Sequence, residues 1–258
     1  MLTYEQLKKY YSDGLAAKMP KNILVEYLQY ELLDSLFKQK RSELLVFIGG
    51  TAIRIIYGSS RFSEDLDFDN FGLPFDEFEE IVDNAGKDLE LKGFSAELRF
   101  VEKGAYHCYL KFPEILYDNN LSSLLQEKVL IRLDTVNKEP SYRPVIHTLN
   151  KFDVFRNILA APADIILAQK LITIMERKRE KGRDFYDASF LLGLTKPDFL
   201  YIKKTTGLAQ DEFGGKFLER LNQLDFNFLA KDVEPFLAAP EQSERIKNFK
   251  DFVVPRLR

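Results

Sequence analysis

The fold is decided by residues 47–69, which read FIGGTAIRIIYGSSRFSEDLDFD. A continuous apolar run over residues 44–48 leads into two glycines, and at that length it suits a buried strand better than a helix. Residues 51–57 then read as a short helix, which Gly58 ends. Aspartates alternate with apolar residues through 65–69, with the two-residue period of a strand. The predicted order is therefore strand, glycine turn, helix and strand.

Two carboxylates in this stretch are spaced to share a cation. Asp65 and Asp67 lie two residues apart on the second predicted strand, so both leave the same face, with Cα atoms about 6.6 Å apart. Mg²⁺ prefers oxygen ligands and commonly binds one or two carboxylates together with substrate phosphates. Gly49 and Gly50 precede the helix, where backbone N–H groups and the helix dipole favour a phosphate. The pattern indicates a metal site beside a phosphate cradle; a solvated strand face with an ordinary tight turn is the alternative.

A third carboxylate is expected if two metal ions are used, because ions about 4 Å apart need more ligands than two side chains supply. Asp134 is the candidate. It lies in the strand-like segment 129–136, VLIRLDTV, where Arg132 and Asp134 share one face and apolar residues fill the other. An acid within an apolar strand is costly unless it is paired, so a salt bridge to Arg132 is the structural alternative.

An EF-hand loop is the main rival explanation of the aspartates. Asp65, Asp67 and Asp69 match the first, third and fifth positions of such a loop. The sixth position would be Asn70, where glycine is needed, and the twelfth would be Asp76, where glutamate is normal. The sequence therefore speaks against a calcium loop.

The surrounding sequence predicts a half rich in strands followed by a helical half. Five segments carry the helical or the alternating period: 20–40 and 74–93 as helices, and 94–101, 106–112 and 129–136 as strands. This makes about five strands before residue 140, and a long helix is expected from Pro162.

We therefore expect an α/β (α+β) fold with three parts. A helical segment spans residues 1–42, a mixed-sheet domain spans 43–150, and a mostly helical domain spans 151–258 and completes the active site.

Composition restricts the classes of function further. The 258 residues are 45% hydrophobic, which excludes a disordered chain. Lys and Arg total 37 against 40 acidic residues, a net charge of −3, so any affinity for a polyanion must come from a local patch. Residues 1–14 have no apolar signal-peptide core, and no run of about 18 uncharged apolar residues follows, so we expect a cytoplasmic protein without membrane contact.

Polar residues of the helical half also fall into a pattern. Lys170 and Arg177 are seven residues apart and lie on one face of a predicted helix. Arg183, Asp184 and Asp187 are three and four residues apart, so polar groups converge at the start of another helix.

Other chemistry finds little support. The basic run over residues 177–183 is either a solvated helix end or a contact for an RNA backbone. His107, His147 and the single cysteine, Cys108, have no partner at metal-ligand spacing, which argues against a zinc site, a thiol nucleophile and a disulfide. No Walker A or G-x-G-x-x-G sequence is present.

These motifs together give a family resemblance. Through Gly49-Gly50-Thr51, Ser63-Glu64-Asp65-Leu66-Asp67-Phe68, the Lys170 helix and Arg183-Asp184-Phe185-Tyr186-Asp187, the chain resembles the AbiEii/AbiGii class of nucleotidyltransferase toxins, within the polymerase-β-like nucleotidyltransferase superfamily. The resemblance covers about residues 45–195. It implies a nucleotidyltransferase fold, transfer of a nucleoside monophosphate from an NTP with release of pyrophosphate, Mg²⁺ or Mn²⁺ as cofactor, an acceptor that is tRNA in some members, and a cognate antitoxin.

The resemblance also implies residue roles, carried over by position. The catalytic residues would be Asp65, Asp67, Asp134, Lys170 and Asp184, and the first three would hold the metal. Lys170 would neutralise triphosphate charge. In the mechanism that we expect from the residues and the resemblance together, Asp134 would be able to receive the proton of the nucleophile. The nucleotide would be bound by Gly49, Gly50, Thr51, Ser63, Lys170, Arg177, Arg183 and Asp187.

Two other functions remain open at this point. The same metal site serves any nucleophile, so the acceptor is either the tRNA 3′ end or a protein hydroxyl that is adenylylated. A catalytically idle module that binds a nucleotide or a partner is the third reading, although every acidic position expected of an active site is filled.

Overall fold

The computed structural model describes residues 1–257, which form two compact units. The first unit comprises Met1–Ala52 and Phe62–Ala160, and the second comprises Ile53–Arg61 and the chain from Ala161 onward. The border between the units therefore lies after Ala160, ten residues beyond the boundary predicted at residue 150. Within residues 1–257, no helix is both long enough and apolar enough to cross a membrane.

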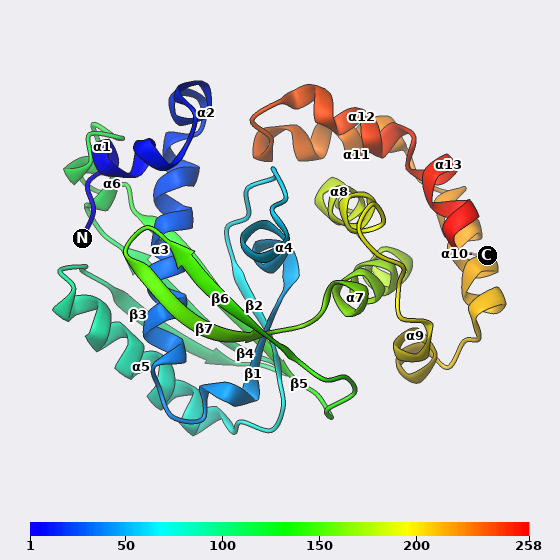
Figure 1. The fold of residues 1–258 in the computed structure, drawn as a ribbon, viewed down its shortest axis with the longest axis horizontal. Helices are drawn as coiled ribbons and strands as arrows, with labels where there is room; N and C mark the ends of the chain where they lie inside the picture. Colours follow the sequence, from blue (N-terminus) through cyan, green and yellow to red (C-terminus); the bar gives the residue numbers. More distant parts are fainter. Residues whose placement is uncertain (258) are drawn as a thin grey trace. The chain divides into compact units, whose positions relative to one another are not determined.

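One mixed sheet of seven strands forms the centre of the first unit, in the order β3-β4-β5-β2-β1-β7-β6 (Figure 1). Strand β1 is antiparallel to β2 and parallel to β7, and β2 is parallel to β5. The strands are β1 (Leu45–Ile48), β2 (Leu66–Asn70), β3 (Glu97–Glu102), β4 (Tyr106–Phe112), β5 (Val129–Asn137), β6 (Val145–Lys151) and β7 (Val154–Ala160). The five strands predicted before residue 140 and the mixed sheet are confirmed.

The last two strands were not predicted, and the helical character expected from residue 151 is wrong over β7. Strands β6 and β7 form a hairpin that reverses between Lys151 and Val154. Phe152 takes the positive-φ position of this turn, at +58°. Hairpin turns usually announce themselves through glycine or asparagine at that position, and a phenylalanine gives no such signal.

Two long helices cover one face of the sheet. Helices α3 (Pro20–Phe37) and α5 (Phe75–Leu91) pack against each other; α3 lies on β5 and β7, and α5 lies on β3 and β4. Phe37 of α3 contacts the ring of Phe68 on β2, so this face holds the apolar core. Because side chains alternate along a strand, the aspartates flanking Phe68 leave the opposite face. Shorter helices complete the unit: α1 (Tyr4–Leu7), α2 (Asp13–Lys18) and α6 (Ile115–Asp118).

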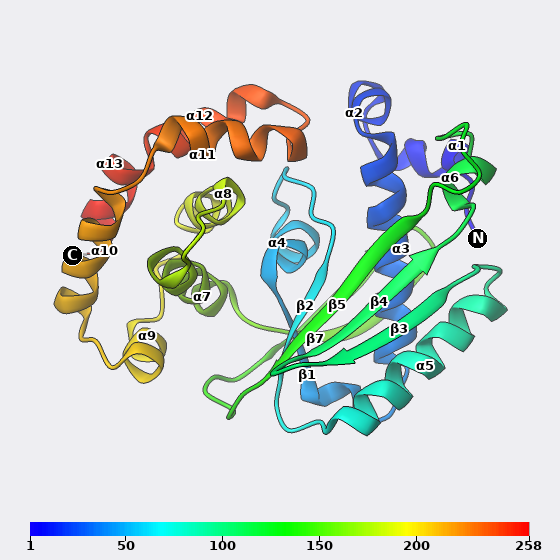
Figure 2. The ribbon, with the colours of Figure 1, turned by 180° about the vertical axis from the view of Figure 1, so that it is seen from behind.

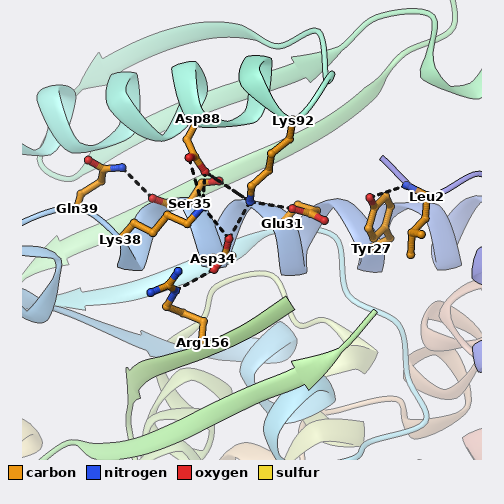
Figure 3. Close-up of polar contacts among 10 residues, drawn as sticks. All are labelled: Leu2, Tyr27, Glu31, Asp34, Ser35, Lys38, Gln39, Asp88, Lys92 and Arg156. Carbon is orange, nitrogen blue, oxygen red and sulfur yellow. Dashed lines mark hydrogen bonds and ion pairs between the residues drawn. The ribbon is translucent and has the colours of Figure 1, made fainter. Parts of the chain in front are cut away.

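A polar network joins α3 to α5 and β7 (Figure 3). Lys92 Nζ lies 2.9 Å from a carboxylate oxygen of Glu31 and 2.8 Å from one of Asp34, and Arg156 Nε lies 2.8 Å from the other oxygen of Asp34. Burial alone would raise the pKa of Asp34, but the neighbouring Lys92 and Arg156 hold it below its usual value. The cations thus allow acids within a largely buried helix, and they tie that helix to its two neighbours.

The second unit is built from helices. They are α7 (Ala163–Glu176), α8 (Gly182–Leu191), α9 (Phe199–Thr206), α10 (Gln210–Leu221), α11 (Phe226–Val233), α12 (Glu244–Lys247) and α13 (Phe249–Val253), seen from behind in Figure 2. Pro162 is the N-cap of α7, as predicted, and the helix ends at Glu176. A Cβ on Gly182 would overlap the carbonyl oxygen of Leu229, so α8 begins where its backbone touches α11.

The segment Ile53–Arg61 belongs to this helical unit although its neighbours in sequence belong to the sheet. It contains the second half of α4 (Gly49–Tyr57). Tyr57 OH donates a hydrogen bond to the carbonyl oxygen of Ala161 at 2.9 Å, and Ser60 Oγ lies 2.8 Å from Tyr186 OH and 2.6 Å from Gln242 Oε1. Nothing in the sequence pattern predicted that this segment would leave the first unit.

Candidate active site

Strand register brings two of the predicted acids together. Strands β2 and β5 run in parallel, with Asp67 directly opposite Asp134. Neighbouring strands lie about 4.8 Å apart, so the two carboxylates project side by side from one face. Asp65 immediately precedes β2 and shares that face by alternation. On β5 the intervening Ile131 and Leu133 are fully buried on the other face, as predicted.

The backbone of Gly49 lies close to the side chain of Asp67. It has a φ of +79°, and a Cβ built on it would overlap Oδ2 of Asp67. A glycine is therefore needed twice, for the backbone conformation and for the room that the Asp67 carboxylate takes. Thr51, in the first turn of α4, donates a hydrogen bond from its hydroxyl to the carbonyl oxygen of Asp65. The helix start and the acid strand thus hold each other in place, with Gly50 in the first turn.

The loop before β2 is held by hydrogen bonds from helix α3. Gln29, a buried residue of α3, donates hydrogen bonds from Nε2 to the carbonyl oxygens of Ser63, at 2.9 Å, and Glu64, at 3.0 Å. The half-buried Ser63 is therefore held by its backbone, and its predicted contact with a triphosphate stays a prediction.

Arg132 and His107 also contact these acids, and the contact of Arg132 was expected only as an alternative. Arg132 lies with Nη2 3.2 Å from Asp65 Oδ2 and with Nε 2.8 Å from Asp134 Oδ2, so the salt bridge weighed for Asp134 is present. His107 stands opposite Asp134 on the neighbouring strand, with Nδ1 2.6 Å from Oδ1. Burial would lower the pKa of Arg132, but Asp65, Asp134 and Asp67 raise it above its usual value.

The sequence gives His107 no partner at metal-ligand spacing, and its hydrogen bond to Asp134, 27 residues away on the next strand, was not predicted. The alternation of β4 and β5 would have shown that both side chains share a face, but not the register that sets them opposite each other.

The donor set fits a hard divalent cation. Asp65, Asp67 and Asp134 offer only carboxylate oxygens, which Mg²⁺ prefers, and the missing Cβ of Gly49 leaves the room that the Asp67 carboxylate occupies. Among residues 1–257, however, no three His, Cys, Asp or Glu residues stand in an arrangement that could hold an ion. Arg132 takes up oxygens of Asp65 and Asp134 instead. The metal role of the three acids therefore stays a prediction.

The second unit contains its own cluster, a chain of alternating charges. Lys170 Nζ on α7 lies 3.0 Å from Asp184 Oδ1 and 2.9 Å from Asp187 Oδ2. Arg177 Nη1 lies 2.9 Å from the other oxygen of Asp184. At the other end, Arg61 binds Asp187 with two contacts of 2.8 Å, from Nε to Oδ1 and from Nη2 to Oδ2. Three cations thus alternate with two anions, in the order Arg177, Asp184, Lys170, Asp187, Arg61.

Burial grades this chain from one end to the other. The Arg177 side chain is 34% exposed and that of Lys170 is 13%, whereas those of Asp187 and Arg61 are 1% and 2%. Burial would lower the pKa of Lys170, but Asp187 and Asp184 raise it above its usual value. Burial would raise the pKa of Asp187, but Arg61 and Lys170 lower it. The charged forms of Lys170 and Asp187 are therefore stabilised by their neighbours.

Arg61 was not among the predicted residues, and the expected convergence of Arg183 with Asp187 is corrected. Arg61 and Lys170 take both oxygens of Asp187. Arg183, four residues before Asp187, makes no hydrogen bond or ion pair within the part of the chain that the structure describes. The spacing along α8 was read correctly, but a partner 126 residues away took the carboxylate.

The sequence matches a known family model. The model for the nucleotidyl transferase AbiEii toxin of type IV toxin–antitoxin systems matches residues 31–255. The chain belongs to the AbiEii nucleotidyltransferase toxin family. A comparison with curated proteins gives no match.

Solved structures show that this AbiEii family member shares its fold with others. It is similar to MenT4, a nucleotidyltransferase toxin from Mycobacterium tuberculosis H37Rv, with 16% identity, a TM-score of 0.59 and coverage of 98% of this chain and 90% of that one. JHP933 from Helicobacter pylori shows 16% identity and a TM-score of 0.54, over 92% of this chain and 93% of that one. A structure described as a nucleotidyltransferase from H. pylori shows 16% identity and a TM-score of 0.56, over 92% and 96%.

Membership makes this AbiEii protein a nucleotidyltransferase and the toxin of a toxin–antitoxin pair. An NTP substrate and an antitoxin partner follow from the family. The family and the fold predicted from the sequence are thereby confirmed, and the individual site residues stay predictions.

Proposed function

We propose that this AbiEii family member transfers a nucleoside monophosphate from an NTP to a hydroxyl at the 3′ end of tRNA, with Mg²⁺ as cofactor and Mn²⁺ as a substitute. The observation that carries this proposal is the register of β2 and β5, which sets Asp67 opposite Asp134 beside the glycine that starts α4. The reaction takes place in the cytoplasm, where NTPs and tRNA occur together.

The acids of the first unit would carry out the chemical step. Asp65, Asp67 and Asp134 would hold the metal ion, which when bound stabilises negative charge on the phosphates and on the departing pyrophosphate. The acceptor oxygen forms a bond to the α-phosphorus while the bond from that phosphorus to the bridging oxygen of the β-phosphate breaks. The proton of the hydroxyl passes to Asp134, whose orientation His107 maintains through Oδ1.

Cations of the second unit would bind phosphate. Lys170 and Arg177 belong to a cluster with one cation in excess, and both retain some exposure. The next two residues, Lys178 and Arg179, are exposed in the connection between α7 and α8. Exposed cations next to a phosphate-binding cluster favour a polyanionic acceptor, and this supports RNA over a protein hydroxyl.

A transfer assay tests the proposal. The purified protein is incubated with Mg²⁺, each of the four NTPs labelled at the α-phosphate, and either total tRNA or extract protein. Asp65→Ala is the test variant. Glu64→Ala is its matched control, because Glu64 is also acidic and adjacent, but its exposed side chain makes no hydrogen bond or ion pair with residues 1–257.

The expected result is label on tRNA with the wild type and with Glu64→Ala, and none with Asp65→Ala. Label on protein instead would replace tRNA by a protein acceptor and keep the chemistry. Equal labelling by Asp65→Ala would remove this carboxylate from the mechanism.

A further inference from the structure

Arg61 is a deeply buried arginine of the second unit. The roles implied by the family resemblance, for the acids and for the lysine helix, do not include it. Its side chain is 2% exposed, and it binds a carboxylate that is 1% exposed. We infer that Arg61 is a positioning residue. It neutralises Asp187, so that the positive charge of Lys170 and one of its N–H donors remain available for a nucleotide phosphate. This inference rests on the proposed function, because it names the group that prepares the phosphate-binding lysine.

The first step is the occupancy of Asp187. Arg61 bonds to both oxygens, through Nε and Nη2, and Lys170 shares only Oδ2. A bidentate guanidinium is the strongest single partner that a carboxylate finds in a protein. The charge of Asp187 is therefore matched by Arg61, and Lys170 is not its main counter-ion.

The ammonium group of Lys170 contacts two carboxylates. Lysine has three N–H donors. Those of Lys170 face Asp184 and Asp187, and no third hydrogen-bond or ion-pair partner occurs for it among residues 1–257. One donor therefore remains for an oxygen of a ligand. Lys170 is also the point where the chain of charges turns from buried to accessible, at 13% exposure.

The segment that carries Arg61 is held in place by hydrogen bonds. Its segment is held on both sides, by the hydrogen bond from Tyr57 to the backbone of Ala161 and by the bonds of Ser60 with Tyr186 and Gln242. The guanidinium thus lies at a fixed place, and Asp187 cannot follow Lys170 toward solvent. Without Arg61, Asp187 would be a buried anion that keeps, among residues 1–257, only Lys170 as an ion-pair partner, and the cluster would have no net charge.

Binding of inorganic tripolyphosphate tests this, because the probe has the phosphates of an NTP but no base and needs no catalysis. The dissociation constant is measured by calorimetry for the wild type, Arg61→Met, Asp187→Asn and the double variant. Tyr186→Phe is the matched control, because it removes the hydrogen bonds of Tyr186 OH with Ser60 and Gln242 but leaves every charge in place. Thermal melting reports the stability of each variant.

Arg61→Met is expected to bind tripolyphosphate about tenfold more weakly, since one charge is lost near the ligand. The double variant restores the excess of one cation, and its affinity is expected to return to within about threefold of the wild type. Tyr186→Phe should bind like the wild type although it melts at a lower temperature. A purely structural role for Arg61 would give no recovery in the double variant.

Two results would overturn the inference: wild-type affinity in Arg61→Met, or a double variant as weak as the single one. If Arg61→Met does not fold, Asp187→Asn decides, because the inference requires it to bind at least as tightly as the wild type. Failure here with intact nucleotidyl transfer would remove the role of Arg61 and leave the proposed function standing. Normal results here without transfer to any acceptor would do the reverse.

Discussion

The three acids on the sheet (Asp65, Asp67 and Asp134) and the chain of charges among the helices, from Arg177 to Arg61, differ in exposure and in how their charges are paired. Asp65 and Asp134 are 27% and 19% exposed, and both contact Arg132. The chain around Lys170 is more deeply buried, and its cations outnumber its anions. The first group is partly exposed to solvent, whereas the second is mostly buried and paired among its own members.

This difference shows which part of the protein is complete without a ligand. An accessible group of acids keeps its charge because water solvates it, and it gains most from a cation that arrives later. A buried chain of alternating charges must be paired within the protein, since an isolated buried charge costs several kcal/mol. We therefore expect substitutions in the acid set to affect chemistry and metal binding, and substitutions in the chain to affect folding and phosphate binding together.

The largest effect is expected from Gly49→Ala. Its new Cβ would displace the Asp67 carboxylate, and the backbone would have to hold a φ of +79° with a side chain. Transfer should fall by more than about 100-fold, because a misplaced catalytic group costs that much. Gly58→Ala is the control: its φ is +77°, but a Cβ there meets nothing within 4 Å. If both variants lose activity equally, backbone strain and not Asp67 explains the loss.

Gly182→Ala should separate folding from chemistry in the helical unit. The added Cβ would overlap the carbonyl oxygen of Leu229, so α8, which carries Asp184 and Asp187, must move away from α11. We expect a loss of about 1–3 kcal/mol in the free energy of unfolding, measured by urea denaturation. Gly215→Ala, exposed in α10, should instead gain about 0.5–1 kcal/mol. A Gly182→Ala protein with wild-type stability would show that this close approach does not hold α8.

Arg132→Gln should show how much of the charge of Asp65 and Asp134 Arg132 compensates. Without its guanidinium, Asp65 and Asp134 lose the cation that they contact. The melting temperature without Mg²⁺ should fall, and the increase that Mg²⁺ causes should grow, with an affinity for the ion about tenfold higher. Arg99→Gln, an exposed arginine of β3, is the control. An unchanged response to Mg²⁺ would separate Arg132 from the metal site.

The smallest effect is the dependence of stability on pH through Asp187. Burial would raise the pKa of this carboxyl, but Arg61 and Lys170 lower it, so its folded-state value lies below the unfolded value of about 3.9. Its contribution to stability is therefore complete above about pH 4 and disappears as the pH falls through the folded-state pKa. In urea titrations, the wild type should exceed Asp187→Asn in stability at pH 7, and the gap should narrow below about pH 4. A constant gap would mean that this carboxylate is not stabilised by its two cations.

The local elements were predictable because their signals lie within a few residues. The apolar run before Gly49 forms β1, and the alternating aspartates form β2. Asp134 and Arg132 lie on the face of β5 opposite the buried Ile131 and Leu133, as predicted. The hairpin through Phe152 was missed since its turn has no glycine.

What the sequence could not provide is pairing over long separations. The contact of His107 with Asp134 depends on strand register, and that of Arg61 with Asp187 depends on a nine-residue segment that joins the helical unit. Periodicity tells which face a side chain occupies, but it does not say which distant residue meets it there. For that reason Arg183, close in sequence, was chosen as the companion of Asp187 in place of Arg61.

The central claim is that the acids act in the chemical step while Lys170 acts in binding, and single-turnover transfer with a labelled NTP tests it most directly. Asp67→Asn and Lys170→Met are compared with the wild type over a range of NTP concentrations with Mg²⁺. The account predicts that Asp67→Asn has no measurable rate even at saturation, and that Lys170→Met reaches a measurable rate but requires a much higher NTP concentration. A wild-type rate at saturation for Asp67→Asn, or an unchanged kcat/KM for Lys170→Met, would contradict it.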